Sequence, residues 1–435
     1  MTGHSARIAR ALARFDALHP AEIDLGLERI AALLQKLGNP HHCLPPVIHV
    51  AGTNGKGSVI AMAGAMAEAA GLRAHIHTSP HLHRLGERFV LGGSGPMTDA
   101  ALAGVLEEVE VANDGAPATR YEFLSAAMFT AFARAPADVA LIEVGLGGEY
   151  DATNVLVRPA LCLITPVAHD HADYLGDDLA GIARAKAGII KPGAPVISAR
   201  QGDVARRIIA GAAAQAKAPL KLAGEDFHTR AEDGRLVYEE ENRLLDLPLP
   251  RLMGAHQVQN AGLAVAAALD LGWTHEAMAK GLERVRWPGR MQMLTRGALA
   301  AQAHKRGAQI VVDGAHNPHA AQALAASVQA LQARDPRPLV LLAGLQQSKD
   351  AAGFFAAFSG LDAHVICVPV PGAPHPMAPV TMHSAVLEAG LGCTIADTVP
   401  CALEVALRLP GGPRILVCGS LYLAAAVLAL NEKKG

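Results

Sequence analysis

The sequence has 435 residues, a formal net charge of −2 and 51% hydrophobic residues. A chain of this length suffices for two or three domains, each with its own apolar core. The near-zero charge argues against partners that bind through charge, such as nucleic acids or anionic membranes, and no window holds the roughly 18 unbroken apolar residues of a membrane span.

Targeting and cysteine patterns favour the cytoplasm. The N-terminus lacks the basic and then apolar pattern of a signal peptide. The six cysteines are scattered without C-x-x-C spacing, which favours buried free thiols in a reducing compartment over a zinc site or disulfides. We therefore expect a globular cytoplasmic protein with free thiols at Cys43, Cys162, Cys367, Cys393, Cys401 and Cys418.

The first 46 residues predict amphipathic helices that prolines interrupt. Pro20, Pro40 and the pair Pro45–Pro46 break the pattern. Between them, Ile23–Ile30 predicts the start of a second helix, whose acidic first turn suits the positive end of the helix dipole.

An apolar strand, a glycine-rich loop and an Ala- and Met-rich helix follow one another within Val47–Ala70. Such a unit holds polyphosphates, because glycines let backbone N–H groups surround the phosphates and the helix N-terminus adds partial positive charge. Lys56 would neutralise the terminal phosphates, and the Ser58 hydroxyl would hold Mg²⁺. The spacing departs from the usual G-x-x-x-x-G-K-[ST], since Gly52 precedes the next glycine by three residues and another glycine separates the lysine from the serine. The alternative is a glycine-rich turn with a surface lysine.

Strands and helices then alternate as far as residue 198. The predicted strands are Ala74–His77, Val139–Glu143, Leu161–Thr165 and Pro195–Ser198. The predicted helices are Asp99–Val111, Tyr121–Ala133 and the segment around Lys186. This alternation predicts βαβ units, and hence a mostly parallel sheet with helices on both faces.

The second half of the chain continues this pattern after an interruption. Val237–Leu249 predicts a small β excursion or a surface loop, His256–Leu271 predicts a long helix, and Trp287–Arg290 breaks the pattern. We place the domain boundary there, with a larger domain over residues 1–290 and a smaller one over 291–435. The smaller domain has a normal domain size, and its predicted strands are Ile310–Val312, Leu339–Leu342, His364–Val368 and Ile415–Cys418.

Several polar residues stand where predicted strands of the first domain end. Ligands of open α/β sheets bind at the carboxyl ends of strands, and Ser79, Glu143 and His171 all stand there. Glu143 ends an apolar run, where a buried charge is costly unless a metal ion or a structural ion pair compensates it. His171, beside Asp170, is either a metal ligand, a residue that supports one, or an ordinary loop histidine.

Two further motifs have both a structural and a functional interpretation. Lys186, on spacing and propensity alone, is a solvated lysine on a helix. Asp313 could bond ribose hydroxyls and His316 could approach a phosphate, whereas Asn317 could cap the next helix. The functional and structural interpretations of this second motif do not exclude each other.

In combination, these motifs resemble the folylpolyglutamate synthase/dihydrofolate synthase family, a branch of the Mur ligase superfamily. They occur in the family's order and span nearly the whole chain. The matching stretches are His49–Ser58, Thr78–Leu82, Glu143–Gly148, Asp151–Asn154, Asp170–His171, Lys186–Ile190, Pro288–Arg290, Asp313–Pro318 and Gly419–Tyr422.

The resemblance implies a P-loop-type, mostly parallel α/β domain like the central domain of Mur ligases, followed by a smaller Rossmann-like α/β domain. It implies an ATP-dependent amide ligase that joins L-glutamate to 7,8-dihydropteroate and to reduced folates. In such enzymes ATP phosphorylates the acceptor carboxylate, and the glutamate amine then attacks the acyl phosphate. The expected cofactors are ATP, Mg²⁺ at two sites and a monovalent cation such as K⁺, and the expected protein is a monomer.

The resemblance also implies roles for individual residues. Lys56, His171 and Lys186 would be catalytic, Lys186 after carbamylation has turned its cation into a carboxylate-like donor. The first Mg²⁺ would be held by Ser58, Ser79 and Glu143, and the second by His171 and Lys186. ATP would contact Gly52, Thr53, Asn54, Gly55, Lys56, Gly57, Ser58, Asn260, Arg290, Asp313 and His316. The acceptor would contact Asp24, Leu25, Gly26, Leu27, Tyr121, Glu122, Phe123, Asp151, Ala152, Thr153 and Asn154.

Two positions depart from the family's pattern. Glu149–Tyr150 stand where the family often has an arginine, and this exchange of a cation for an anion is expected to alter the preference for a growing polyglutamate tail. Ala185 stands where a glutamate often precedes the modified lysine, which removes one carboxylate near the expected metal site.

Three alternatives remain at this stage. A Mur ligase of cell-wall synthesis usually has a sizeable N-terminal domain, for which the residues before Gly52 leave no room. A nucleotide-driven switch would not need a second domain with Asp313 and His316 at strand ends. A folylpolyglutamate synthase without the second activity is also compatible, although Asp24–Leu27 resembles bifunctional bacterial members and favours both activities.

Overall fold

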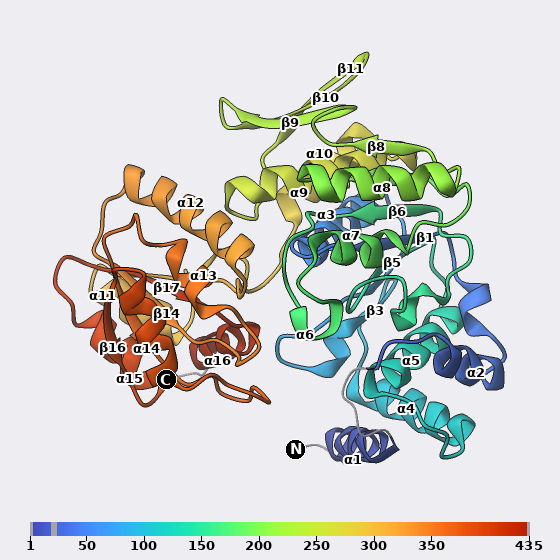
Figure 1. Cartoon of the computed structure of the whole chain (residues 1–435), viewed down its shortest axis with the longest axis horizontal. Coiled ribbons are helices and arrows are strands. Elements are labelled where there is room, and N and C mark those ends of the chain that lie inside the picture. Colours follow the sequence, from blue (N-terminus) through green and yellow to red (C-terminus); the bar gives the residue numbers. More distant parts are fainter. Residues whose placement is uncertain (1–2, 19–23, 433–435) are drawn as a thin grey trace. The chain divides into compact units, whose positions relative to one another are not determined.

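The computed structural model describes residues 3–18 and 24–432, which form two compact units (Figure 1). The first unit comprises residues up to 168 together with 177–250 and 258–285. The second comprises 169–176, 251–257 and the chain from 286 onward. Two short segments therefore pack with the second unit although their chain neighbours belong to the first. The predicted boundary between residues 290 and 291 stays a prediction.

The first unit is built on an eight-stranded sheet in the order β4-β3-β2-β5-β1-β6-β7-β8. The neighbouring strands in the run β2-β5-β1-β6-β7-β8 are all parallel to each other. At one edge of the sheet, β3 pairs with β2 and β4 pairs with β3 in antiparallel fashion. This confirms the predicted α/β class with a mostly parallel sheet. The strands are β1 Val47–Ala51, β2 Ala74–His77, β3 Phe89–Leu91, β4 Gly95–Pro96, β5 Val139–Glu143, β6 Leu161–Ile164, β7 Val196–Ser198 and β8 Leu220–Leu222.

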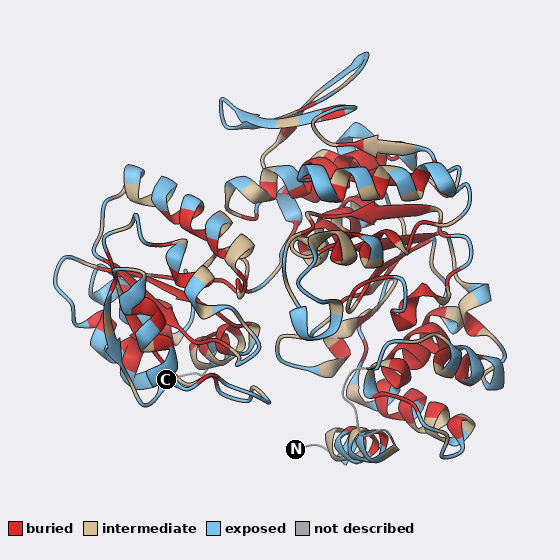
Figure 2. Ribbon diagram, in the orientation of Figure 1, coloured by how far each residue is buried: buried red, intermediate tan, exposed pale blue. Residues whose placement is uncertain are grey.

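The central strands of this sheet are buried along their whole length. Every residue of β1, β5 and β6 is buried (Figure 2), as expected of parallel strands that helices cover on both faces. The residues that follow these strands consequently emerge at one edge of a rigid core.

An N-terminal group of helices shares a hydrophobic core with this sheet. The group consists of α1 Gly3–Leu18, α2 Glu28–Lys36, α4 Asp99–Asn113 and α5 Arg120–Arg134. Phe15 of α1 and Phe123 of α5 stack with ring centroids 3.8 Å apart, and both are fully buried. Helix α2 begins later than predicted, at Glu28, and the predicted start at Ile23 lies outside the described residues.

The remaining helices of this unit include a close helix pair. At Gly281 of α10, an added methyl group would lie 2.6 Å from the Cα of Met66 on α3, so glycine permits the two backbones to approach. The bounds are α3 Lys56–Ala69, α7 Leu179–Ala187, α8 Asp203–Gln215 and α10 His275–Arg284; α9, Ala255–Asp270, begins in residues of the second unit.

A separate antiparallel sheet follows β8. It consists of β9 Phe227–Glu232, β10 Arg235–Glu240 and β11 Arg243–Pro248 in the order β11-β10-β9. The predicted β excursion at Val237–Leu249 is therefore confirmed in type, but it starts ten residues earlier, at Phe227. The first strand was missed because four of its six residues, such as His228, are exposed and its pattern is mostly polar.

The second unit holds a six-stranded sheet in the order β12-β13-β17-β14-β15-β16, parallel except for β12. Its hydrophobic face packs against helices in a single core. The strands are β12 Gln292–Met293, β13 Gln309–Val312, β14 Leu339–Ala343, β15 Ala363–Cys367, β16 Gly392–Ile395 and β17 Arg414–Cys418. The helices are α6 Ala172–Leu175, α11 Ala298–Lys305, α12 Pro318–Arg334, α13 Ala351–Ala356, α14 Pro379–Glu388, α15 Val399–Leu407 and α16 Leu421–Glu432.

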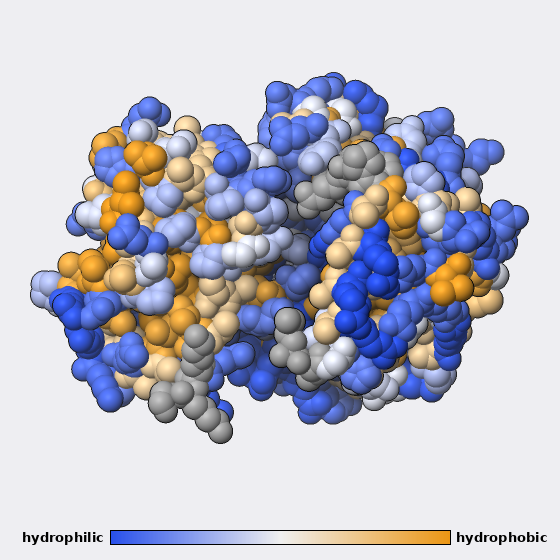
Figure 3. All heavy atoms as spheres, turned by 90° about the horizontal axis from the view of Figure 1, so that it is seen from below, coloured by the Kyte–Doolittle hydropathy of each residue, from blue (hydrophilic) through white to orange (hydrophobic). Residues whose placement is uncertain are grey.

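The surface of the second unit is mixed in character. Val380, Leu387 and Val405 are large apolar side chains exposed on its helices, and hydrophobic surface lies among hydrophilic surface in Figure 3. Among the described residues, no helix is both long enough and apolar enough to cross a membrane.

The cysteines are free thiols, as predicted, but only some of them are buried. All six cysteines are free thiols, and Cys162, Cys367 and Cys418 are buried as expected. Cys43 and Cys401 are exposed, so the prediction of burial is wrong for them. Each lies in a short helical segment whose other face packs inward, and a small side chain is tolerated on either face.

Three histidines, His49, His75 and His77, are buried within the first sheet. His49 of β1 and His77 of β2 both pair in register with Ile142 of β5, and neither side chain is exposed. The Nε2 atom of His49 lies 2.9 Å from the Thr153 hydroxyl, and Nδ1 of His77 lies 2.9 Å from the carbonyl oxygen of Arg88. Burial lowers the pKa of each from 6.5 to about 3, so both are neutral in the folded protein at neutral pH.

His49→Gln is expected to flatten the dependence of stability on pH. Between pH 6.5 and about 3 the unfolded chain binds a proton that folded His49 does not bind. The free energy of unfolding therefore falls as pH falls, by up to about 1.4 kcal/mol per pH unit for this group. Urea unfolding between about pH 5 and 7 should show the smaller slope in His49→Gln. His228→Gln, at an exposed position, should keep the wild-type slope; equal slopes in all three proteins would contradict burial of His49.

Candidate functional site

The glycine-rich loop connects β1 to α3 and is held by the segment that follows β6. The Thr53 amide donates to the carbonyl oxygen of Pro166 over 2.9 Å, and the Thr53 hydroxyl donates to that of Ala168 over 2.9 Å. Gly55 precedes the helix with φ +94, and α3 begins at Lys56. The first turn of α3 thus presents backbone N–H groups and the positive end of the helix dipole, which favours a bound anion.

Gly52 stands where no side chain fits. Its φ is +138, and an added methyl group would overlap the Thr165 side chain and lie 2.8 Å from the Thr165 carbonyl oxygen. Both the backbone angle and the contact disfavour any other residue.

Gly52→Ala is expected to lower the free energy of unfolding by about 3 kcal/mol or more, because Thr165 belongs to a packed strand end that cannot move aside. The displaced loop should also bind ADP at least about tenfold more weakly, as measured by calorimetry. Gly71→Ala is the control, since Gly71 has φ +80 but no atom within 4 Å of the added methyl group. It should cost only about 1 kcal/mol; equal losses in the two variants would contradict the close approach to Thr165.

Lys56 and Glu143 meet beside this loop. The Lys56 ammonium lies 3.1 Å from the carbonyl oxygen of Gly52 and 3.9 Å from a Glu143 carboxylate oxygen. Glu143 ends β5, is 5% exposed and accepts the Ser79 amide over 3.0 Å. Ser58, in the first turn of α3, is also buried. The structure therefore brings the loop, Ser79 and Glu143 together at the carboxyl ends of β1, β2 and β5.

Lys186 points into the same place. It lies on α7, is 4% exposed, and its ammonium donates to the carbonyl oxygen of Gly52 over 3.1 Å. The interpretation as a solvated helix lysine is therefore wrong, because the buried face of α7 packs against the loop. Two ammonium groups, those of Lys56 and Lys186, contact one carbonyl oxygen.

Asn260 of α9 also reaches the loop. A methyl group added at Gly55 would lie 2.6 Å from the Asn260 side-chain oxygen. Asn260 is buried, so its amide is a fixed polar neighbour of the residue that precedes α3. The predicted contact of Asn260 with ATP stays a prediction.

Tyr121 lies beside the turn that follows β5. Its hydroxyl would lie 2.5 Å from a methyl group added at Gly145, so the ring covers the glycine turn after β5. Burial raises the pKa of Tyr121 well above its ordinary value, and the charge of Asp151 raises it further. The Tyr121 hydroxyl therefore stays protonated.

The neighbours of Tyr121 have structural contacts. Glu122 accepts the Thr119 amide over 2.7 Å in a capping box at the start of α5, and it accepts Nε of Arg29 over 3.1 Å. Arg29 also donates to the Asp24 carboxylate over 2.8 Å. Arg29, which the sequence did not single out, thus joins two of the predicted substrate segments. Phe123 is fully buried in the core, and its predicted contact with the acceptor stays a prediction.

The Asp151–Asn154 segment is buried and shapes the turn after β5. The Asp151 carboxylate accepts the amides of Gly145 and Leu146 over 3.0 and 2.9 Å. The Thr153 hydroxyl donates to Asp151 over 2.5 Å, and the Asn154 side chain donates to the carbonyl oxygen of Glu149 over 2.8 Å. Ala152 is buried too. The structure therefore gives these side chains the task of holding residues 145–149 in place.

In the second unit, the predicted ATP residues surround the end of β13. Asp313 is 5% exposed and accepts the amides of Met291 and Ala315, each over 2.7 Å. The Arg290 guanidinium lies beside Gly314, 2.6 Å from the position of an added methyl group. Asp313 and Arg290 therefore both lie at the turn that follows β13, Asp313 through its hydrogen bonds and Arg290 through its contact with Gly314.

A buried carboxylate, Asp170, organises the neighbouring loop of this unit. It accepts Lys349 over 2.6 Å and the Asn317 side-chain amide over 2.9 Å, and Nε2 of His316 lies 3.6 Å away. Burial by itself would raise the pKa of Asp170, but the nearby charges of His316, His171 and Lys349 hold that pKa well below its ordinary value.

The predicted residues of this motif have clear local roles. Asn317 caps α12, as predicted, by accepting the Ala320 amide over 2.9 Å. His316 bonds the carbonyl oxygen of Gly314 through Nδ1 over 2.9 Å, and because a carbonyl only accepts, Nδ1 carries the hydrogen. His171 follows Asp170 with φ +56, and 41% of its side chain is exposed.

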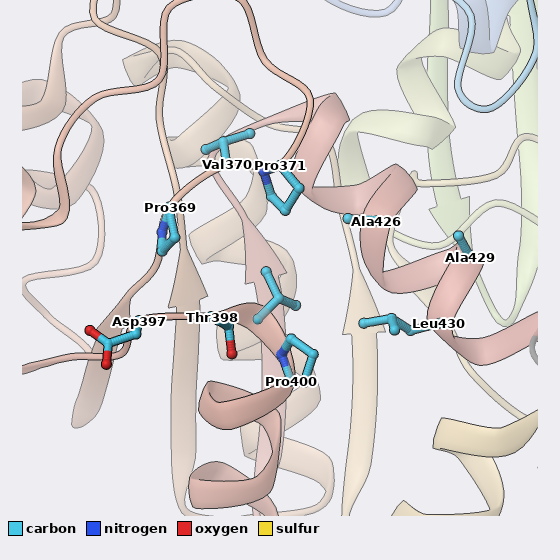
Figure 4. Close-up of a pocket in the computed structure, with 10 residues that line it drawn as sticks. Pro369, Val370, Pro371, Asp397, Thr398, Pro400, Ala426, Ala429 and Leu430 are labelled. Carbon is cyan, nitrogen blue, oxygen red and sulfur yellow. The ribbon is translucent and has the colours of Figure 1, made fainter.

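A pocket of about 360 Å³ in the second unit contains none of the predicted site residues (Figure 4). Its walls are the Pro369–Pro371 segment, the start of α15 and the α16 residues Ala426, Ala429 and Leu430. The Asp397 carboxylate points away from the other labelled side chains. An apolar pocket of this kind does not suit a polyphosphate.

Within residues 3–18 and 24–432, no group of three or more His, Cys, Asp or Glu side chains is arranged to hold a metal ion. The oxygen donors at the end of β5 are of another kind. They are the Glu143 carboxylate and the serines at 58 and 79, which are hard ligands of the class that Mg²⁺ takes together with phosphate oxygens.

The chain is similar to known proteins over most of its length. Residues 50–268 match the Mur ligase middle domain, and residues 289–421 match the Mur ligase glutamate ligase domain. A folylpolyglutamate synthase of Lacticaseibacillus casei is 34% identical over 418 residues, which are 92% of each chain.

Solved structures show the same similarity. E. coli FolC in complex with DHPP and ADP superposes with a TM-score of 0.87 at 30% identity, over 97% of each chain. A bifunctional folylpolyglutamate synthase/dihydrofolate synthase with Mn, AMPPNP and L-glutamate bound gives a TM-score of 0.84 at 29% identity, over 97% of each chain.

Proposed function

The chain belongs to the folylpolyglutamate synthase/dihydrofolate synthase family of Mur ligases, and we propose that it joins L-glutamate both to 7,8-dihydropteroate and to reduced folates. It is an ATP-dependent ligase that uses a divalent metal ion. The acceptors, the acyl phosphate route and the roles of individual residues are the proposal.

The observation that carries the proposal is the pair of lysines at Gly52. Lys56 and Lys186 each place an ammonium 3.1 Å from the same carbonyl oxygen, and both are mostly buried. Two cations that contact the same oxygen atom repel each other where water is scarce. Carbamylation of Lys186 would replace that repulsion by an attraction and would supply an oxygen donor for a metal ion.

The residues at the strand ends suit a divalent cation. Glu143 is a buried carboxylate with a serine hydroxyl on each neighbouring element, at Ser58 and Ser79, which is the oxygen chemistry that Mg²⁺ prefers. These three would hold one ion, and Lys186 as a carbamate with His171 would hold a second. Bound there, the ions would neutralise charge on the phosphates of ATP.

The chain's own residues would position and polarise the reactants. The first turn of α3 would bind the phosphates through backbone amides, and Lys56 would stabilise the charge that develops on the transferred phosphoryl group. Asn260 would fix the loop, while Arg290, Asp313 and His316 of the second unit would contact the remainder of ATP. Tyr121, protonated and beside Gly145, would face the acceptor carboxylate without competing for the phosphoryl group.

The two departures from the family's pattern are neighbours in space. The Glu149 amide donates to the carbonyl oxygen of Ala185 over 2.7 Å. A glutamate at position 185 would place a second negative charge beside Glu149, and the two would repel each other. The presence of Ala185 is therefore consistent with the presence of Glu149. Glu149 is exposed, and its negative charge would disfavour an acceptor that carries a long polyglutamate tail.

An activity assay with two acceptors tests the proposal. The protein is incubated with ATP, Mg²⁺, L-glutamate and either 7,8-dihydropteroate or tetrahydrofolate, and phosphate release and glutamylated product are measured. We expect glutamate-dependent release with both acceptors. Activity with tetrahydrofolate alone would restrict the protein to folylpolyglutamate synthesis, and no activity with either would refute the proposed function.

Three further elements complete the proposal. We propose a monomer in the cytoplasm, where the six free thiols would persist. A monovalent cation such as K⁺ would assist charge compensation at the phosphates. Sedimentation and the dependence of activity on K⁺ test the first and the last of these elements.

A further inference from the structure

We propose that Asp170 is a positioning residue that fastens the loop of His171 to the second unit through Lys349 and Asn317. Residues 169–176 belong to the second unit, although their chain neighbours on both sides belong to the first. Asp170, Lys349 and Asn317 share a task that is separate from contact with ATP.

The contacts of Asp170 come from two elements of the second unit that are distant in sequence. Lys349, in the loop between β14 and α13, donates to one carboxylate oxygen over 2.6 Å. Asn317, at the start of α12, donates to the other over 2.9 Å. The pair is well shielded, with the Lys349 and Asp170 side chains 10% and 7% exposed. A shielded ion pair with a further hydrogen bond is a strong and directional attachment.

The same carboxylate also fixes the backbone of the loop. Its Oδ1 accepts the His171 amide over 2.9 Å. His171 then begins α6, in which the Tyr174 and Leu175 amides each donate to the His171 carbonyl oxygen over 3.0 Å. One carboxylate, that of Asp170, therefore binds both the second-unit residues Lys349 and Asn317 and the backbone of His171.

Asn317 performs two tasks at once. Its side-chain oxygen caps α12 by accepting the Ala320 amide, and its nitrogen donates to Asp170. Nothing in helix capping requires the second contact, since serine, threonine or aspartate would cap equally well. The asparagine amide performs both tasks because its oxygen accepts from the helix while its nitrogen donates to the carboxylate.

The consequence is that His171 moves with the second unit. This last step rests on the proposed function, in which His171 is a metal ligand. If the loop is released, His171 is no longer presented in a single position, and residues that orient a metal ligand typically change metal affinity by about 10–100-fold when they are replaced.

Hydrogen exchange on the full-length protein tests the attachment directly. Lys349→Met should speed exchange of the Tyr174, Leu175 and Gly176 amides by at least about tenfold, because their short helix loses its anchor. Asn317→Asp should do the same while retaining the cap, since a carboxylate caps well but repels Asp170. Lys349→Arg should restore slow exchange. Lys221→Met is the matched control, because Lys221 is ion-paired with Asp270 over 2.5 Å in the first unit.

A metal titration tests the functional step. The Mn²⁺ concentration that gives half-maximal activity should rise by about 10-fold or more in Lys349→Met and return toward the wild-type value in Lys349→Arg. The KM for glutamate should change less than the metal requirement. The thermal unfolding of each variant is recorded alongside to confirm a folded protein.

Each outcome decides one statement. Unchanged exchange at residues 174–176 in both Lys349→Met and Asn317→Asp would overturn the attachment. Faster exchange with an unchanged metal requirement would overturn the presentation of His171 by the second unit. A wild-type protein without glutamate-dependent phosphate release would refute the proposed function instead, and the exchange experiment would still decide the role of Asp170.

Discussion

Lys56→Ala is expected to lower kcat by about 10²–10³-fold or more, which corresponds to roughly 3–4 kcal/mol of lost transition-state stabilisation. The Lys56 ammonium lies over the loop, 3.1 Å from the Gly52 carbonyl oxygen and 3.9 Å from Glu143. In the proposed function, this ammonium would stabilise the charge that develops on the transferred phosphoryl group. The effect should appear in single-turnover measurements of phosphate release with saturating ATP and glutamate.

Lys280→Ala is the control for this prediction. Lys280 is an exposed lysine of α10 that pairs with Glu276 one turn earlier, and its loss should leave kcat within about twofold of the wild type. A Lys56→Ala protein with near-normal turnover would contradict the assignment of residues 52–58 as the phosphate loop.

Lys186→Ala is expected to reduce activity by a comparable factor of about 10²–10³, because it would remove both the proposed metal ligand and the group that balances Lys56. Unlike the first variant, it should regain part of its activity with added short carboxylic acids. Lys186 is buried beside Gly52, so truncation of its side chain leaves a cavity there. A short carboxylic acid could occupy this cavity and supply the missing oxygen donor.

Two observations sharpen this second prediction. Lys186→Arg keeps the positive charge but cannot be carbamylated in the same way, so it should remain inactive with or without the acid. A crystal of the wild-type protein should show continuous density beyond the lysine Nζ. Absence of that density, together with full activity in Lys186→Arg, would refute the carbamate.

Much of the first unit could be predicted because its signals are local. Apolar runs such as Val139–Glu143 mark buried parallel strands, and the glycines after Val47–Ala51 mark the loop that the structure contains. Since parallel strands end at one edge of a sheet, Ser79 and Glu143 were expected near each other, and the Ser79 amide does bond the Glu143 carboxylate.

Other features depend on partners that the local sequence does not reveal. Lys186 in an Ala-rich helix has the same pattern whether it faces water or a loop, and its actual partner, Gly52, lies 134 residues away. Glu122 takes part in a helix cap and Phe123 lies in the core, and neither contact is visible in the local sequence. Only the packing of α5 decides which of its residues faces the strand ends.

The sequence by itself determined the α/β class, the order of the strands along the chain and the family to which the protein belongs. These properties follow from hydrophobic periodicity, glycine positions and motif order, all of which are visible within short windows. The tertiary structure alone decided that Lys186 is buried beside Lys56, that Arg29 joins Asp24 to Glu122, and that Asp170 anchors residues 169–176 in the second unit. The physical reason is that a buried charge must find its partner wherever packing brings one, and packing joins residues far apart in the chain.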